Sequence, residues 1–142
     1  IFRNLVLLSV ALYAVWFCIP YFSVNLYSPE TLDAISWAGS DALLSFDALA
    51  IVAFLFLFLY AITSVGLIYF KPWARISFLL LTLSSILTTP LFGIVVLPAI
   101  ESSIFQVVNI LDGVLIAFMY FTSVSNEFIN SHNKALVKDA AR

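Results

Sequence analysis

The chain has 142 residues, of which 63% are hydrophobic and only 10% are charged, and its net charge is −2. Soluble domains carry about 25% charged residues, so this composition excludes an ordinary soluble domain and indicates an integral membrane protein. With six Lys and Arg residues in all, the chain lacks the basic surface that binds nucleic acid. The length suits one compact domain.

The first apolar stretch runs from about residue 5 to residue 22. It follows Arg3, as the apolar core of a secretory signal would, but it is longer than such a core, and no small-residue cleavage site follows it. The stretch ends in Cys18-Ile19-Pro20-Tyr21-Phe22, which is typical of the aromatic belt at a membrane interface. We therefore expect a retained membrane helix.

The segment after this helix, residues 23–46, is the longest one between spans. Ser28-Pro29-Glu30 predicts a helix start, with a capping serine, proline at the first helical position and an acid near the positive end of the helix dipole. Gly39 could end that helix. A short interfacial helix is expected here, and the alternative is a docking surface for a partner.

Three further apolar stretches cover about residues 47–70, 75–97 and 104–124, and each reaches the roughly 20 residues that a spanning helix needs. Backbone groups in lipid must be hydrogen-bonded within the protein, so helices are expected. Residues 1–125 are therefore predicted to form an all-α integral membrane bundle of four transmembrane helices. Residues 126–142 are predicted to form a C-terminal tail.

The basic residues predict the orientation of this bundle. With four spans, all six fall on one side of the membrane: Arg3, Lys71, Arg75, Lys134, Lys138 and Arg142. The other side carries Glu30, Asp33, Asp41, Asp47 and Glu101. The positive-inside rule places both termini in the cytoplasm. Four spans with short loops are typical of bacterial inner-membrane proteins, so we expect the protein in a bacterial inner (plasma) membrane.

Asp112 lies within the fourth predicted span. An ionisable side chain at that depth normally faces a protein interior or a water-filled cavity. At 1.5 Å per residue from Ile104, Asp112 would lie about 12 Å below the outer end, near the midplane. With no cation predicted near it, burial favours the neutral, hydrogen-bonding carboxyl. Its expected partner is Ser85, Thr88 or Tyr13.

Other polar and small residues in the spans complete a candidate intramembrane polar site. Asn109 lies one turn from Asp112, and Thr89 lies on the third span at a similar depth. The whole candidate site comprises Asp112, Asn109, Ser85, Thr88, Thr89 and Tyr13. Gly113 and Ala117 form a small-xxx-small pattern that lets another helix approach closely. Pro90 is expected to kink the third helix, because it lacks an amide hydrogen.

Three roles are open for this site. Asp112 could lock two helices together through hydrogen bonds, it could contact another subunit, or it could be a proton- or cation-responsive site. The sequence does not decide among the three.

An enzyme is not expected, because the chain has no cluster of His, Cys or carboxylate side chains suited to catalysis. Cys18 and His132 form no metal motif, one cysteine excludes an intrachain disulfide, and no cofactor is predicted. The expected function is that of a non-catalytic accessory or interaction subunit of a larger membrane complex, or of an immunity-type protein that blocks a membrane toxin. The alternative is a small oligomeric protein that conducts ions or solutes through Asp112. The expected partners are the lipid bilayer and either another membrane protein or further copies of the chain.

Overall fold

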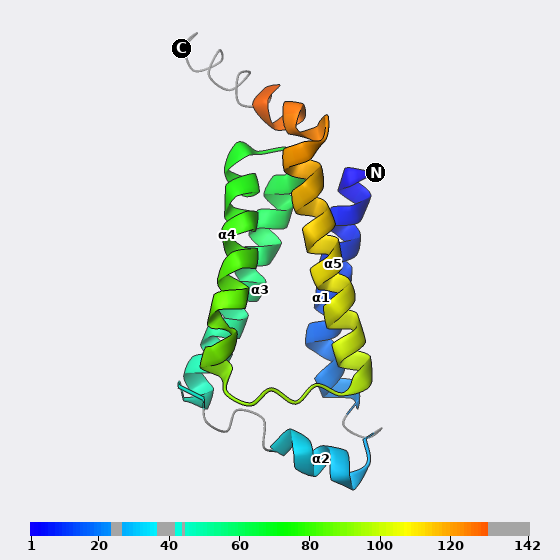
Figure 1. The fold of residues 1–142 in the computed structure, drawn as a ribbon, viewed down its shortest axis with the longest axis vertical. Coiled ribbons are helices and arrows are strands. Elements are labelled where there is room, and N and C mark those ends of the chain that lie inside the picture. Colours follow the sequence, from blue (N-terminus) through cyan, green and yellow to red (C-terminus); the bar gives the residue numbers. More distant parts are fainter. Residues whose placement is uncertain (24–26, 37–41, 44, 131–142) are drawn as a thin grey trace.

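A computed structural model describes residues 1–23, 27–36, 42–43 and 45–130. Its four long helices are α1 (Phe2–Ser23), α3 (Phe46–Ile68), α4 (Pro72–Thr88) and α5 (Ala99–Phe121), and a short helix, α2 (Pro29–Ser36), follows α1. All four long helices are apolar and long enough to cross a membrane, α4 together with the turn after it. The predicted all-α bundle is confirmed, with four helices that could span a membrane and a short helix between the first two of them (Figure 1).

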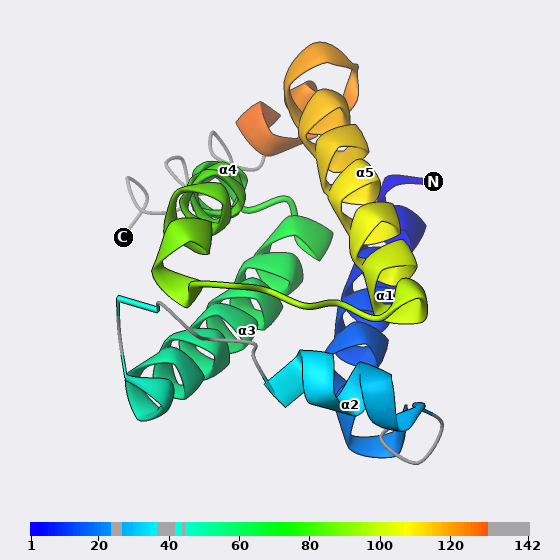
Figure 2. The same cartoon turned by 60° about the horizontal axis from the view of Figure 1, so that its bottom comes forward.

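The helices are not equally close to one another. α1 packs against both α5 and α3, and α3 packs against α4, whereas α4 and α5 make little contact. Figures 1 and 2 show α4 and α5 spreading apart toward the end where an extended segment joins them. The bundle is therefore closed on the α1 side and opens between α4 and α5.

The connection between α4 and α5 differs from the sequence-based expectation. The third span was expected to be helical to residue 97, but α4 ends at Thr88 and a 3-10 turn covers Thr89–Phe92. Pro90 lies in that turn, so it helps to end the helix where a kink was expected. Gly93 then takes a φ of 70°, which suits glycine. α5 begins at Ala99, five residues before the expected start at 104.

The segment between α1 and α3 contains the predicted capping serine. The Ser28 hydroxyl accepts a hydrogen bond from the Thr31 amide at 3.3 Å. A hydrogen bond with the same hydroxyl holds the pKa of the exposed Glu30 carboxyl below its usual range. The Tyr27 hydroxyl donates to Glu101 Oε1 at 2.5 Å and so connects this loop to the first turn of α5. Gly39, the predicted helix end, lies outside the described residues.

Arg3, Lys71 and Arg75 all lie at one end of the bundle, which we call the basic end. Here the chain turns after α5 and becomes helical again over residues 124–130. This brings Phe128, which is buried, against the rings of Phe2 and Phe70. The predicted tail therefore begins inside the fold, and its residues 131–142 lie outside the described part of the chain.

Candidate intramembrane polar site

Asp112 is buried in the bundle and hydrogen-bonded to hydroxyl groups from two other helices. Its Oδ1 accepts from the Ser9 hydroxyl of α1 at 2.8 Å and from the Tyr60 hydroxyl of α3 at 2.7 Å. The Ser9 and Tyr60 oxygens are themselves 2.7 Å apart. The three side chains, which we call the oxygen triangle, therefore join α1, α3 and α5 at one point.

The sequence brings these residues together through the spacing of each helix. On α1, Ser9 follows the buried residues Phe2 and Val6 at steps of four and three, so the three share one face. Each residue of the triangle also lies about 10 to 14 Å from the basic end of its helix, at 1.5 Å per residue. Shared depth and inward faces together place the three oxygens in contact.

Aromatic rings cover the triangle. The Tyr13 ring stacks on the Tyr60 ring, with centroids 4.6 Å apart and an angle of 15° between the rings. The Phe78 ring of α4 also packs against the Tyr60 ring, at a centroid distance of 5.6 Å. The Asp112 carboxyl is buried, and the two hydroxyls supply the hydrogen bonds that it receives, both at Oδ1.

The number of hydrogens bears on the charge of the carboxyl. A triangle of three oxygens has three short edges, and Ser9 and Tyr60 supply one hydroxyl hydrogen each. With both hydroxyls donating to Oδ1, the edge between Ser9 and Tyr60 holds no hydrogen. If one of them donates along that edge instead, a proton on the Asp112 carboxyl fills the edge left open. The neutral carboxyl expected from the sequence stays a prediction, and the geometry is compatible with it.

The partners expected on the third span do not meet Asp112. The hydroxyls of Ser85, Thr88 and Thr89 donate instead to carbonyl oxygens of their own helix, at 2.8 to 3.2 Å. The physical reason is that α4 makes little contact with α5 and spreads away from it toward the end that carries these hydroxyls (Figure 1). Tyr13 lies near the site, but its ring stacks on Tyr60, and among the described residues no hydrogen bond joins its hydroxyl to the carboxyl.

Ser9 and Tyr60 were therefore missed as partners by sequence reasoning. With α5 starting at 104, as expected from the sequence, Tyr60 would lie deeper than Asp112, but α5 starts at Ala99. Five extra residues at the outer end move Asp112 about 7.5 Å deeper, to the level of Tyr60. Ser9 could have been found as the hydroxyl that interrupts the apolar run of the first helix four residues before Tyr13.

The remaining predicted residues lie on another face of α5. Asn109, Gly113 and Ala117 are all exposed, and a Cβ at Gly113 would meet no atom within 4 Å. Within the described part of the chain, no hydrogen-bond partner reaches the Asn109 amide. These three residues, together with the exposed Ile110, form what we call the open face of α5.

The open face is continuous with the contact between α5 and α4. Asn109 and Gly113 lie about three and two turns before Tyr120, so the three positions lie on nearly the same face of the helix. The Tyr120 ring lies under the Arg75 guanidinium of α4, at 4.7 Å, and its hydroxyl donates to the Arg75 carbonyl at 3.5 Å. The two helices thus meet at the basic end and leave this face uncovered farther along.

Over the described residues, no group of three His, Cys, Asp or Glu side chains is placed to hold a metal ion. No protein-family model, curated protein or solved structure matches the chain. Function must therefore be inferred from the chain's own residues.

Proposed function

We propose that this multi-pass membrane protein is a non-catalytic interaction subunit that binds a helix of another membrane protein through the open face of α5. The observation that carries the proposal is the Asn109 amide, which is exposed and has no hydrogen-bond partner among the described residues. Asn109 lies about 15 Å from the start of α5 and about 18 Å from its end, in the middle of the span.

An unpaired amide in that position is unfavourable. Moving an amide from water to a medium without hydrogen-bonding groups costs about 4–8 kcal/mol. A polar side chain on a neighbouring helix can accept and donate at once to the Asn109 amide, and such bonds join helices within membranes. Asn109 therefore favours a helix with a polar group at the same depth.

The rest of the open face suits close approach of such a helix. Gly113 has no side chain and Ala117 has a small one, and small residues four apart let two helix backbones come close together. Because Tyr120 and Arg75 close the bundle at the basic end, a partner helix would contact α5 over the remaining length.

The accessory-subunit and immunity-type functions both need this contact, and they differ in what the partner does. We further propose that the basic end faces the cytoplasm, because Arg3, Lys71 and Arg75 lie there. Conduction through Asp112 has less support, because the carboxyl is buried and hydrogen-bonded to Ser9 and Tyr60.

Photo-crosslinking in the native membrane tests this proposal. A photoreactive amino acid at Ile110, which is 65% exposed beside Asn109, is compared with the same group at Leu55, which is 53% exposed on α3. We expect a discrete product with one identified membrane protein from position 110 and none from position 55. The product should be lost when Asn109→Leu is added.

Two results would contradict the proposal. A product of twice the chain mass would mean that copies of the chain cover this face. Crosslinks from position 110 to lipid alone would mean that no protein covers it.

A further inference from the structure

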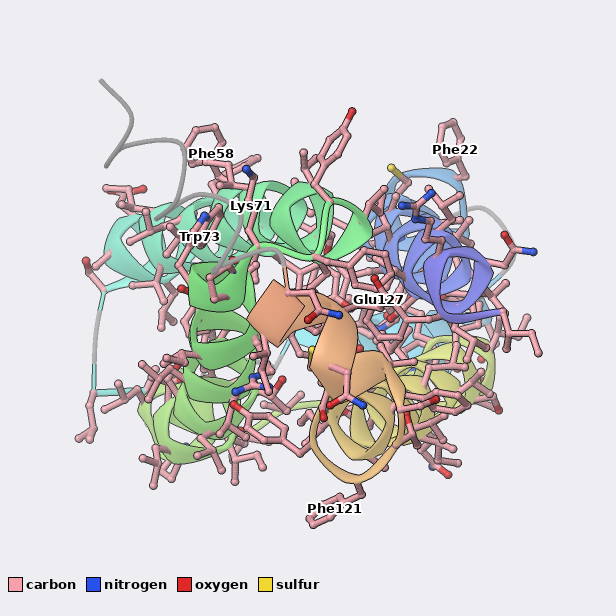
Figure 3. The ribbon with its side chains drawn as sticks, turned by 90° about the horizontal axis from the view of Figure 1, so that it is seen from above. Phe22, Phe58, Lys71, Trp73, Phe121 and Glu127 are labelled. Atoms are coloured by element: carbon pink, nitrogen blue, oxygen red, sulfur yellow. The ribbon has the colours of Figure 1, made fainter. Side chains whose placement is uncertain are left out.

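A groove on the surface of the bundle, beside the α3–α4 turn, is separate from both the oxygen triangle and the open face. It has a volume of about 290 Å³ and is lined by Ile62, Val65, Gly66, Tyr69, Lys71 and Trp73. Figure 3 shows Lys71 and Trp73 lying together at the basic end. We propose that this groove binds an anionic phospholipid, with its phosphate at Lys71 and an acyl chain along α3.

The shape of the groove depends on Gly66. A Cβ at this position would lie 2.6 Å from the Ala74 Cβ and 2.9 Å from the Trp73 ring, so only glycine lets α4 approach α3 this closely. The Trp73 ring therefore lies against bare backbone and forms one wall. The opposite wall is apolar, with Ile62 and Val65 one turn apart and 42% and 54% exposed.

The charge of the groove is positive and uncompensated. In the ranges the structure covers, no carboxylate pairs with the exposed Lys71 ammonium. Lys71 also lies at the N-terminus of the 17-residue α4, where no side chain caps the helix and where the helix dipole favours an anion. A phosphodiester is the anion that a membrane presents at this level.

The aromatic residues fix the level of the groove in the bilayer. Tyr69 and Trp73 are 67% and 48% exposed, and such amphipathic rings prefer the layer of the lipid headgroups. Lys71 lies between them in the chain, so its ammonium reaches the phosphates while Ile62 and Val65 lie among the acyl chains. One lipid molecule satisfies both parts of the groove at once.

Quenching of tryptophan fluorescence by brominated lipid tests this site on the full chain. Trp16 and Trp37 are replaced by phenylalanine so that Trp73 alone reports, and the protein is placed in vesicles of phosphatidylcholine and phosphatidylglycerol in equal amounts. Two samples are compared: in one the phosphatidylcholine is brominated, and in the other the phosphatidylglycerol is brominated. One cation near anionic lipid contributes about 1 kcal/mol. We therefore expect phosphatidylglycerol to bind beside Trp73 with an affinity about five-fold higher than that of phosphatidylcholine.

Three variants test whether the lipid preference depends on Lys71. Lys71→Gln should abolish the preference, so that the two lipids bind with about equal affinity. Lys71→Arg should keep the preference. Arg3→Gln removes the same charge from the same end, but Arg3 lies over Phe70 outside the groove, so this variant should keep the preference.

The proposal is overturned by equal quenching from the two lipids, or by a preference that survives Lys71→Gln. It is also overturned if neither lipid quenches Trp73, which would mean that protein covers the groove. Circular dichroism of Lys71→Gln distinguishes a lost lipid from a lost fold.

Discussion

The oxygen triangle and the open face of α5 place two polar side chains of one helix in opposite situations. Asp112 is 7% exposed and bonded to two other helices, whereas Asn109, three residues earlier, is exposed and unpaired within the described chain. Both lie well inside the span, so depth does not distinguish them. What distinguishes them is that α1 and α3 approach Asp112, while α4 diverges from Asn109.

This contrast separates residues that hold the bundle together from residues that are free to bind something else. A polar group in a span is a stabilising contact where neighbouring helices supply hydrogen bonds, and it is an unsatisfied group where they do not. Substitutions on the two faces should therefore change different quantities.

The largest effect is expected from Asp112→Ala. It leaves the Ser9 and Tyr60 hydroxyls without their shared acceptor, and an unsatisfied buried group costs about 1–3 kcal/mol. We expect the free energy of unfolding in mixed micelles to fall by about 2 kcal/mol, and by less in Asp112→Asn, which keeps a hydrogen-bonding side chain. Wild-type stability in Asp112→Ala would show that the triangle does not hold the helices together.

A smaller effect is expected from Tyr60→Phe, which keeps the ring stacked on Tyr13 and removes only the hydroxyl. Hydrogen bonds between membrane helices contribute about 0.6 kcal/mol each on average. The Tyr60 hydroxyl takes part in two, so the free energy of unfolding should fall by about 1 kcal/mol. Tyr13→Phe is the matched control, and it should change little because the Tyr13 hydroxyl makes no hydrogen bond within the described part of the chain. Equal losses in the two variants would contradict the assignment.

The smallest effect concerns Glu30, at the start of α2. Its pKa is lowered below the ordinary value of 4.5, chiefly by the hydrogen bond with Ser28. The resulting stabilisation of the folded form is therefore present above pH 4.5 and is lost as the pH falls through the lowered pKa.

An NMR titration of the Glu30 carboxyl measures this shift directly. The midpoint is expected below 4.5 and should move up toward that value in Ser28→Ala. A midpoint at or above 4.5 in the wild-type chain would contradict the proposed stabilisation of the Glu30 carboxylate by Ser28.

The four spans follow directly from the sequence, because each is a long apolar run and lipid allows only hydrogen-bonded helices there. The short helix after Ser28 was also predictable from its capping residues. The hydrogen-bond partners of Asp112 were not, because they depend on where each helix starts and on how it is rotated. The shift of the α5 start to Ala99 changed which side chains share its level.

The open face was likewise visible only as a pattern. Gly113 and Ala117 have the spacing of a helix contact, but the sequence could not say whether that contact lies inside the bundle or outside it. The structure leaves the space around Gly113 empty. The composition of α4 gives no sign that this helix diverges, and Pro90 and Gly93 show only where it ends.

The most direct test of the account uses Gly113→Leu in the chain that carries the photoreactive group at Ile110. Since no atom lies within 4 Å of the position of a Cβ at Gly113, leucine should leave the free energy of unfolding within about 0.5 kcal/mol of the wild type. The same substitution should abolish the crosslink to the partner protein, because it fills the space that a partner helix needs. An unchanged crosslink, or a clear loss of stability without the partner, would contradict the account.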